Sequence, residues 1–97
     1  MARIYHGIGG GSLSKERQRE IYFTCKNFAD QPQKIQEKIL RLCRMAGGYN
    51  ADALFEMLTT DQKLERILQK YYIASATTLY RARNKLFELW AKEENRG

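Results

Sequence analysis

Residues 61–90 read DQKLERILQK YYIASATTLY RARNKLFELW. The first third of this stretch carries apolar residues at the spacing of one helix face, which predicts a short helix. The segment 71–74 then breaks the pattern. Ser75 is a favourable N-cap residue, so a longer helix is expected from about residue 76 to residue 92 or beyond. A short helix, a tight break and a longer second helix are typical of a helix-turn-helix.

The longer helix is predicted to be amphipathic. We expect one face to close the core, formed by Leu79, Ala82, Leu86, Leu89 and Trp90. We expect the opposite face to point outward, with Thr77, Tyr80, Arg81, Asn84 and Lys85. In a helix-turn-helix, the outward face near the start of the second helix lies in the DNA major groove. The pattern therefore predicts a surface for duplex DNA.

Four residues on this outward face have side chains suited to base edges. Arg81 can donate two hydrogen bonds to a guanine edge, and Asn84 can pair with an adenine edge. Thr77 can contact a thymine methyl group or a phosphate. Tyr80 offers a hydroxyl group to a phosphate and an aromatic ring to a sugar or a methyl group. We expect these residues to carry any reading of DNA sequence.

Three further residues are expected to position the protein without reading sequence. Lys85 and Arg83 suit phosphate contacts, and the free amides at Ser75 can hold a phosphate at the helix start. The same side chains would also fit an ordinary solvated face, because Arg, Asn and Lys are common on the outer side of any amphipathic helix. The surrounding pattern, and not the helix alone, favours DNA.

The charge balance agrees with a polyanionic partner. The chain has 97 residues, a formal net charge of +6 and a pI near 9.5. Residues 14–47 hold eight Lys and Arg against four Asp and Glu, and residues 71–91 hold three basic residues against one acidic residue. Basic proteins of this kind favour nucleic acid or acidic membrane surfaces. The basic residues at the start of the first helix oppose its dipole, which hints at phosphate contact, although a solvated basic face explains them too.

Upstream of residue 61, the sequence predicts an arm and three helices. Residues 1–13 form a glycine-rich arm, expected to be flexible or to touch DNA, and their spacing does not fit a phosphate loop. Helices are expected over 14–29, 32–46 and 51–58, with Gly47 and Gly48 ending the second. Ser12 or Ser14 should cap the first helix and Asn50 the third, while Thr59 with Gln62, or Thr60, should cap the helix after residue 61.

The predicted fold class is therefore all-α: a single domain over 14–97 of about five helices, with the helix-turn-helix at 61–91. No apolar run is long enough for a membrane span and no leader is visible, so a cytoplasmic protein is expected. Cys25 and Cys43 should be buried thiols. No metal or cofactor site and no catalytic set are expected, because His6 is the single histidine and no metal-ligand spacing occurs.

The stretch YYIASATTLYRARNKL resembles the C-terminal helix-turn-helix of small phage-type regulators, the RinA and ArpU group, distantly similar to region 4 of sigma factors. The residues that match are Tyr71, Tyr72, Ser75, Thr78, Leu79, Tyr80 and Arg81. The resemblance covers about 61–91 and implies control of transcription on phage or integrated-element DNA. The chain departs from the family at Ile73, where glycine is usual, and at Gln69, where a small residue is usual. A longer or more open turn is therefore expected.

Three hypotheses follow from these patterns. The first is a DNA-binding transcription regulator of a phage or mobile element, with double-stranded DNA and RNA polymerase as partners. A homodimer is a further expectation, because Phe87, Leu89 and Trp90 offer more apolar surface than one small core needs. The second is the DNA-recognition part of a packaging or recombination complex, similar to a small terminase subunit. The third is an adaptor that binds proteins and not DNA; exposed apolar patches would favour it.

Overall fold

The computed structural model describes residues 13–96, and every regular element among them is helical. The helices are α1 (Lys15–Lys26), α2 (Gln33–Gly47), α3 (Ala51–Thr59), α4 (Leu64–Lys70) and α5 (Ala76–Arg96). Single 3-10 turns follow α1 at Phe28–Asp30 and α2 at Gly48–Asn50. The all-α class is confirmed, and residues 13–96 contain no strand.

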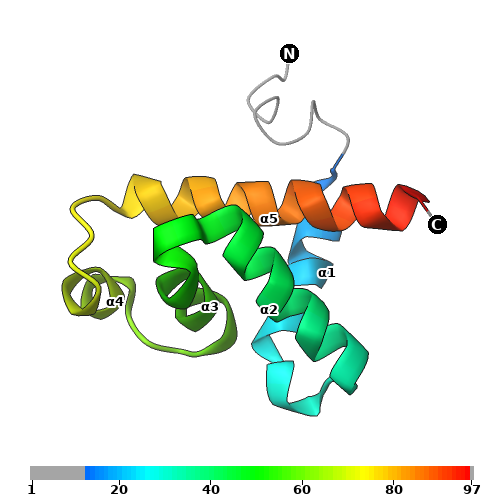
Figure 1. Ribbon diagram of the computed structural model, residues 1–97, viewed down its shortest axis with the longest axis horizontal. Coiled ribbons are helices and arrows are strands. Elements are labelled where there is room, and N and C mark those ends of the chain that lie inside the picture. Colours follow the sequence, from blue (N-terminus) through cyan, green and yellow to red (C-terminus); the bar gives the residue numbers. More distant parts are fainter. Residues whose placement is uncertain (1–12, 97) are drawn as a thin grey trace.

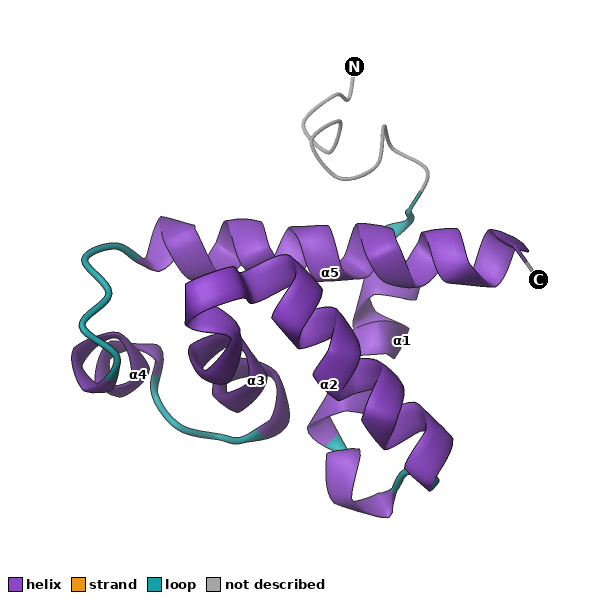
Figure 2. Cartoon of the chain, viewed as in Figure 1, coloured by secondary structure: helices purple, strands orange, loops and turns teal. Residues whose placement is uncertain are grey.

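The long helix α5 lies along one side of the molecule, and α2 and α3 pack against it (Figure 1). The helix α2 makes its most extensive contacts with α3 and with α5. Figure 2 shows α4 set apart by the loops on either side of it, at the end of the molecule where α5 begins. None of the described helices is both long and apolar enough to cross a lipid bilayer.

The buried side chains form two clusters. The main core joins α1, α2, α3 and the carboxyl half of α5, and its buried members are Leu13, Ile21, Cys25, Ile39, Leu42, Cys43, Leu54, Leu58, Ala82, Leu86, Phe87 and Trp90. The small cluster joins α3, α4 and the start of α5 through Ala53, Ile67 and Leu79. Met57 packs against both clusters. The predicted helix stripes therefore supply the core, as their spacing requires.

The predicted arm needs a correction at its end. Leu13 was assigned to the arm, but its side chain is 5% exposed and belongs to the main core. Its carbonyl oxygen also accepts a hydrogen bond from Nε2 of Gln18, at 3.3 Å. The rest of the predicted arm, including His6 and the proposed cap Ser12, lies outside the described residues. Leu13 therefore belongs to the packed body of the protein, one residue before the predicted start of the domain.

The helix ends are partly as predicted. The hydroxyl oxygen of Ser14 accepts a hydrogen bond from the amide of Arg17 at 3.0 Å, which confirms one of the two proposed caps of α1. Gly48 ends α2 with a φ of 55°, a conformation that favours glycine. Asn50, in contrast, makes no side-chain cap to α3, so that prediction is wrong.

The predicted capping box before α4 is also wrong. The hydroxyl groups of Thr59 and Thr60 donate backward, to the carbonyl oxygens of Phe55 and Glu56 at 2.8 and 2.7 Å. They therefore finish α3. The hydroxyl oxygen of Thr60 also accepts a hydrogen bond from the amide of Gln62 at 3.2 Å, but α4 begins only at Leu64, with no side-chain cap. Threonine hydroxyl groups can bond either way along the chain, and spacing alone does not distinguish the two.

Candidate functional site

The junction between α4 and α5 is a Schellman turn built around Tyr72. This residue has a φ of 56°, the only positive φ outside glycine among the described residues. The amide of Ile73 donates to the carbonyl oxygen of Leu68 at 2.9 Å, and that of Tyr72 donates to Gln69 at 3.3 Å. These two bonds close the end of α4 in the way that a glycine usually does.

This geometry corrects the sequence alignment of the turn. Ile73 was placed at the position that is usually glycine, but the left-handed residue is Tyr72, one position earlier. The side chain of Tyr72 is 95% exposed, so it adds backbone strain without packing in return. Ile73 instead packs against the small cluster beside Leu68. The hydrophobic contact that accompanies a Schellman turn is thus present.

The start of α5 is capped as predicted. The hydroxyl oxygen of Ser75 accepts a hydrogen bond from the amide of Thr77 at 3.1 Å. The carbonyl oxygen of Ser75 accepts from the amide of Thr78 at 3.2 Å. Both Ser75 and Thr77 are exposed, so the first turn of α5 faces solvent.

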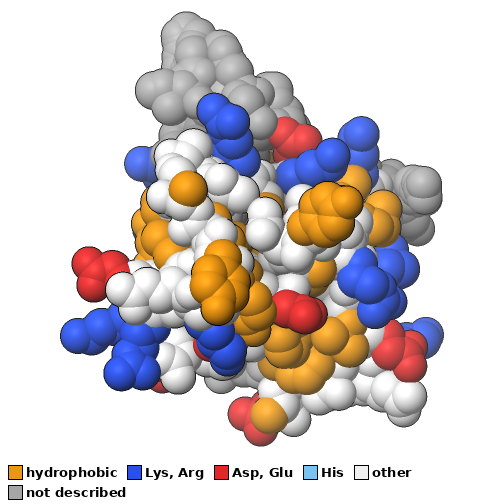
Figure 3. All heavy atoms as spheres, turned by 60° about the vertical axis from the view of Figure 1, so that its left-hand side comes forward, with side chains coloured by type: hydrophobic (Ala, Val, Ile, Leu, Met, Phe, Trp, Pro, Cys, Tyr) orange, Lys and Arg blue, Asp and Glu red, His pale blue; other side chains and the backbone are white. Residues whose placement is uncertain are grey.

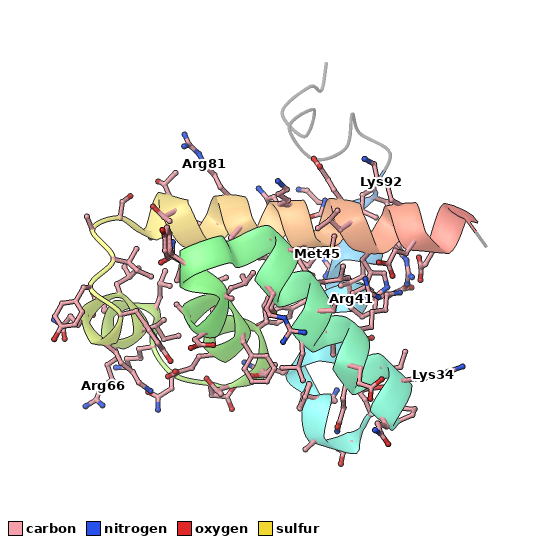
Figure 4. All side chains as sticks on the ribbon, in the orientation of Figure 1. Lys34, Arg41, Met45, Arg66, Arg81 and Lys92 are labelled. Carbon is pink, nitrogen blue, oxygen red and sulfur yellow. The ribbon has the colours of Figure 1, made fainter. Side chains whose placement is uncertain are left out.

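The predicted outward face of α5 divides into two parts. Thr77, Arg81 and Lys85 are exposed, and Asn84 beside them is half-buried. Figure 4 shows Arg81 pointing away from the body of the protein, on the same side as Lys92 farther along the helix. Arg66 of α4 points away on the opposite side of that view. The exposed cations of α4 and α5 therefore do not form one flat surface.

Tyr80 forms the second part, on another side of α5, where it contacts Arg83, a residue predicted to bind phosphate. The guanidinium carbon of Arg83 lies 5.1 Å from the ring centre of Tyr80 and 5.7 Å from that of Phe87. Its Nη2 atom donates to Oδ1 of Asn84 at 3.3 Å. Its Nε atom is buried and has no hydrogen-bond partner. Tyr80, at 42% exposed, completes this stack.

These two residues line a cleft that sequence analysis did not predict. The cleft holds about 570 Å³ and lies between α1, α5 and the segment from Met57 to Leu64. Its lining residues are Lys15, Arg19, Tyr22, Lys26, Met57, Thr60, Asp61, Gln62, Leu64, Tyr80, Arg83 and Phe87. The α1 residues repeat every three or four positions, so a second stripe on that helix was visible in the sequence. What the sequence did not show is that this stripe faces α5.

Lys26 holds the wall of this cleft in place. Its Nζ atom donates to the carbonyl oxygen of Thr60 at 2.7 Å and lies 2.8 Å from Oδ1 of Asp61. The hydrogen bond to Asp61 raises the pKa of the Lys26 ammonium group above its usual value. The segment between α3 and α4 is thereby tied to α1, and the cleft has a fixed third side.

At the carboxyl end of α5, basic residues of α1 and α2 form ion pairs and a cation–π contact within the protein. Arg41 of α2 forms a two-point ion pair with Glu93, with distances of 2.5 and 3.0 Å. Arg17 of α1 pairs with Glu94 and with Glu20, and its hydrogen bond holds the pKa of the Glu94 carboxyl group below its usual value. Nζ of Lys38 lies 4.3 Å from the ring centre of Trp90. Part of the positive charge of α1 and α2 is therefore structural.

The two cysteines are buried, as predicted. Cys25 and Cys43 are free thiols in the main core, and burial raises the pKa of each thiol to about 12. A thiol with such a pKa is a poor nucleophile at neutral pH. Within residues 13–96, no group of three or more His, Cys, Asp or Glu side chains is placed to hold a metal ion.

The homodimer prediction loses one of its arguments. Phe87 and Trp90 were expected to leave apolar surface uncovered, but they are 3% and 4% exposed. Both belong to the main core, and Leu89 is half-buried against it. The apolar surface at this end of α5 is therefore covered within one chain.

Comparison of the chain with family models, curated proteins and solved structures gave no match.

Proposed function

We propose that this protein binds double-stranded DNA through the outward face of α5 and acts as a transcription regulator of a phage or mobile element. The observation that carries the proposal is the exposure of Thr77, Arg81 and Lys85 on one side of a capped helix. Neither cation forms an ion pair with a described residue. Side chains that are not neutralised by the protein remain available to phosphates and bases.

The proposed roles follow from position on the helix. Arg81 reads a guanine edge, Asn84 an adenine edge and Thr77 a thymine methyl group, as the outward face of a second helix would. Lys85 holds a phosphate, and the amides at Ser75 hold another. Tyr80 and Arg83 lie at the edge of this surface, turned toward the cleft, so we assign them weaker DNA contacts. The resemblance to RinA and ArpU regulators supports the same reading and suggests RNA polymerase as a protein partner.

The first test is a salt series of binding to random duplex DNA. Phosphate contacts give weak affinity that falls steeply as salt rises. We expect binding at low salt, and a salt slope that decreases by about one unit in Lys85→Ala. Lys34→Ala is the matched control, because Lys34 is an exposed lysine at the far end of α2 (Figure 4). Absence of binding to any duplex at low salt would overturn the proposal.

The second test distinguishes contacts that read the base sequence from phosphate contacts that only position the protein. A specific site is first selected from a random duplex pool. Arg81→Ala should then weaken that site by about 1–3 kcal/mol more than random DNA, whereas Lys85→Ala should weaken both equally. Equal losses for Arg81→Ala on the selected site and on random DNA would remove its base-reading role and leave a general DNA-binding surface.

A protein-binding adaptor is the second candidate, favoured by large apolar side chains on the surface. Phe23 and Met45 are 57% and 53% exposed, and Tyr49 is fully exposed. In Figure 3, which turns the α4 end forward, hydrophobic side chains lie between the basic ones. Lysate pull-down with the wild type and with Met45→Ser would test it: a partner lost with Met45→Ser and retained with Arg81→Ala would favour the adaptor.

A further inference from the structure

The cleft between α1 and α5 combines positive charge with aromatic walls. Four of its side chains are basic (Lys15, Arg19, Lys26 and Arg83), and Asp61 is the single acidic one, which gives the lining a net formal charge of +3. Asp61 is already paired with Lys26 at 2.8 Å. Of the other basic residues in the lining, Arg19 from α1 and Arg83 from α5 form no ion pair with a described residue.

Arg83 is a candidate anion ligand in the wall of the cleft. It is half-buried, it stacks against Tyr80 and Phe87, and its Nε–H has no acceptor. The Nε atom itself is buried, so a phosphate in the cleft would meet the guanidinium group through its terminal nitrogen atoms. A guanidinium group presents its donors as a flat fork that matches the oxygens of a phosphate.

The other walls of the cleft suit a flat ring. Tyr22 from α1 and Tyr80 from α5 contribute aromatic rings, and Met57 and Leu64 contribute apolar contacts. Aromatic side chains can stack on any of the nucleobases, because every base has a flat π-face. The volume of about 570 Å³ lies within the range of small-molecule sites, so a mononucleotide can be accommodated.

We propose that this cleft is a nucleotide-binding site, in which Arg19 and Arg83 hold the phosphate and the tyrosines hold the base. The site adjoins the outward face of α5 and shares with it only the edge residues Tyr80 and Arg83, and it does not depend on the DNA-binding proposal. The shared chemistry is a phosphate attached to a nucleobase, which can come from a free nucleoside phosphate or from the end of a DNA strand.

The test uses the full chain and calorimetric titration with adenosine and cytidine monophosphates and triphosphates. Inorganic phosphate and adenosine serve as probes for the two halves of the ligand. We expect a nucleotide to bind at least about tenfold more tightly than either probe, because the two halves then act together. Binding of inorganic phosphate as tightly as a nucleotide would overturn the nucleotide assignment, as would a dissociation constant for every nucleotide weaker than about 1 mM.

Substitutions locate the site. Arg19→Glu should weaken nucleotide binding by about tenfold or more, and Arg44→Glu, an equal charge change at an exposed position of α2, should leave it unchanged. Arg81→Ala should also leave it unchanged, which separates this site from the DNA surface. Equal effects of Arg19→Glu and Arg44→Glu would show that binding reflects net charge alone and would overturn the proposal.

A competition experiment distinguishes the two sources of the nucleotide. A short single-stranded oligonucleotide is titrated into the wild type and into Arg19→Glu, with and without a saturating mononucleotide. If the strand end is the ligand, Arg19→Glu weakens the oligonucleotide and the mononucleotide competes with it. If the free nucleotide is the ligand, Arg19→Glu weakens the mononucleotide alone. Either result supports the cleft as a nucleotide site, and an unchanged affinity for both ligands rejects it.

Discussion

At its carboxyl end α5 is clasped by α1 and α2, whereas at its amino end it rests on α3 and α4. The carboxyl half places Leu86, Phe87 and Trp90 in the main core. Ion pairs from Arg17 and Arg41 then fasten the last turns. The amino half has Leu79 in a cluster with two other buried residues, and its exposed cations make no described ion pair. One helix therefore has an end held by the fold and an end left available for a partner.

This difference explains why positive charge in the sequence predicted function only in part. Arg17 and Arg41 look no different from Arg81 in a list of basic residues, yet their partners lie at Glu94 and Glu93, far along the chain. Surface ion pairs add little stability individually, but they remove cations from the set that can meet DNA. The basic residues of the first two helices therefore divide among surface ion pairs, the cleft and the solvent.

The largest expected effect compares a leucine from each end. Both Leu86 and Leu79 are fully buried, so a change to alanine removes three buried carbon atoms at either position. Leu86→Ala should lower the free energy of unfolding by about 3–5 kcal/mol, and Leu79→Ala by about 2–3 kcal/mol, because a small cluster relaxes more easily around a cavity. Urea denaturation measures both values.

Amide hydrogen exchange then shows which helices lose stability in each variant. Leu79→Ala should speed exchange in α4 more than in α2, as expected of a locally held unit. Equal losses of stability, with exchange rising uniformly over both helices, would mean that the two ends of α5 are held alike.

The cap at the amino end gives the next largest effect. Ser75→Ala removes the acceptor for the amide of Thr77 and should cost about 1 kcal/mol of stability. The same change should fray the first turn of α5, which is measurable as faster exchange at the amides of residues 76–78. Ser75→Asp restores an acceptor and adds a charge that the helix start favours, so it should recover the lost stability. A recovery of stability without slower exchange would contradict this account.

The strained turn predicts a stabilising change of similar or smaller size. Tyr72 adopts a left-handed conformation at a cost of about 1–2 kcal/mol, and its exposed ring gains little. Tyr72→Asn should therefore raise stability by about 0.5–1 kcal/mol, since asparagine tolerates this conformation without the entropy cost of glycine. Thermal unfolding measures it, with Tyr49→Asn as a control at another exposed tyrosine. A lower midpoint for Tyr72→Asn than for the control would show that the ring of Tyr72 has a packing role.

The smallest effect concerns pH at the carboxyl end. The bond from Arg17 lowers the pKa of Glu94 in the folded protein relative to its ordinary value of 4.5. The ion pair therefore contributes fully above that ordinary pKa, and its contribution is lost as pH falls through the lowered one. Glu94→Gln should remove this part of the acid dependence and change neutral stability by less than about 1 kcal/mol. Urea denaturation followed by circular dichroism at several pH values should therefore show the small difference between the wild type and the variant at neutral pH and its loss at low pH.

The fold could be predicted as far as local patterns determine it. Apolar stripes placed Ile39, Leu42, Leu54 and Leu58 in the core, and the short helix, break and capped long helix were correctly positioned. The turn residue was misplaced by one position, because no glycine marks the left-handed conformation. The capping box failed because a threonine can bond in either direction.

The candidate site was predicted less completely, because spacing on one helix does not reveal the neighbours of that helix. Thr77, Arg81 and Lys85 are exposed, as their helical positions indicated. Tyr80 was assigned to the same outward face and Arg83 to a phosphate contact, but α1 lies beside both residues and encloses a cleft. Which stripe of α1 meets which stripe of α5 is decided by packing of residues far apart in sequence.

Because α5 is one continuous helix, the direction of its exposed face at the amino end is fixed relative to its packed face at the carboxyl end. Its 21 residues extend about 31 Å, against a longest molecular dimension of 35 Å. Insertion of one residue within α5 rotates everything beyond it by about 100°, so Arg81 would lose its relation to Trp90 and Glu93. The loop between α3 and α4 has no helical phase to keep, and its contacts with Lys26 involve only Thr60 and Asp61. Insertions after Asp61 should therefore be tolerated better than insertions within α5, and a scan of single-residue insertions along the gene would show this as a gap in accepted positions over α5.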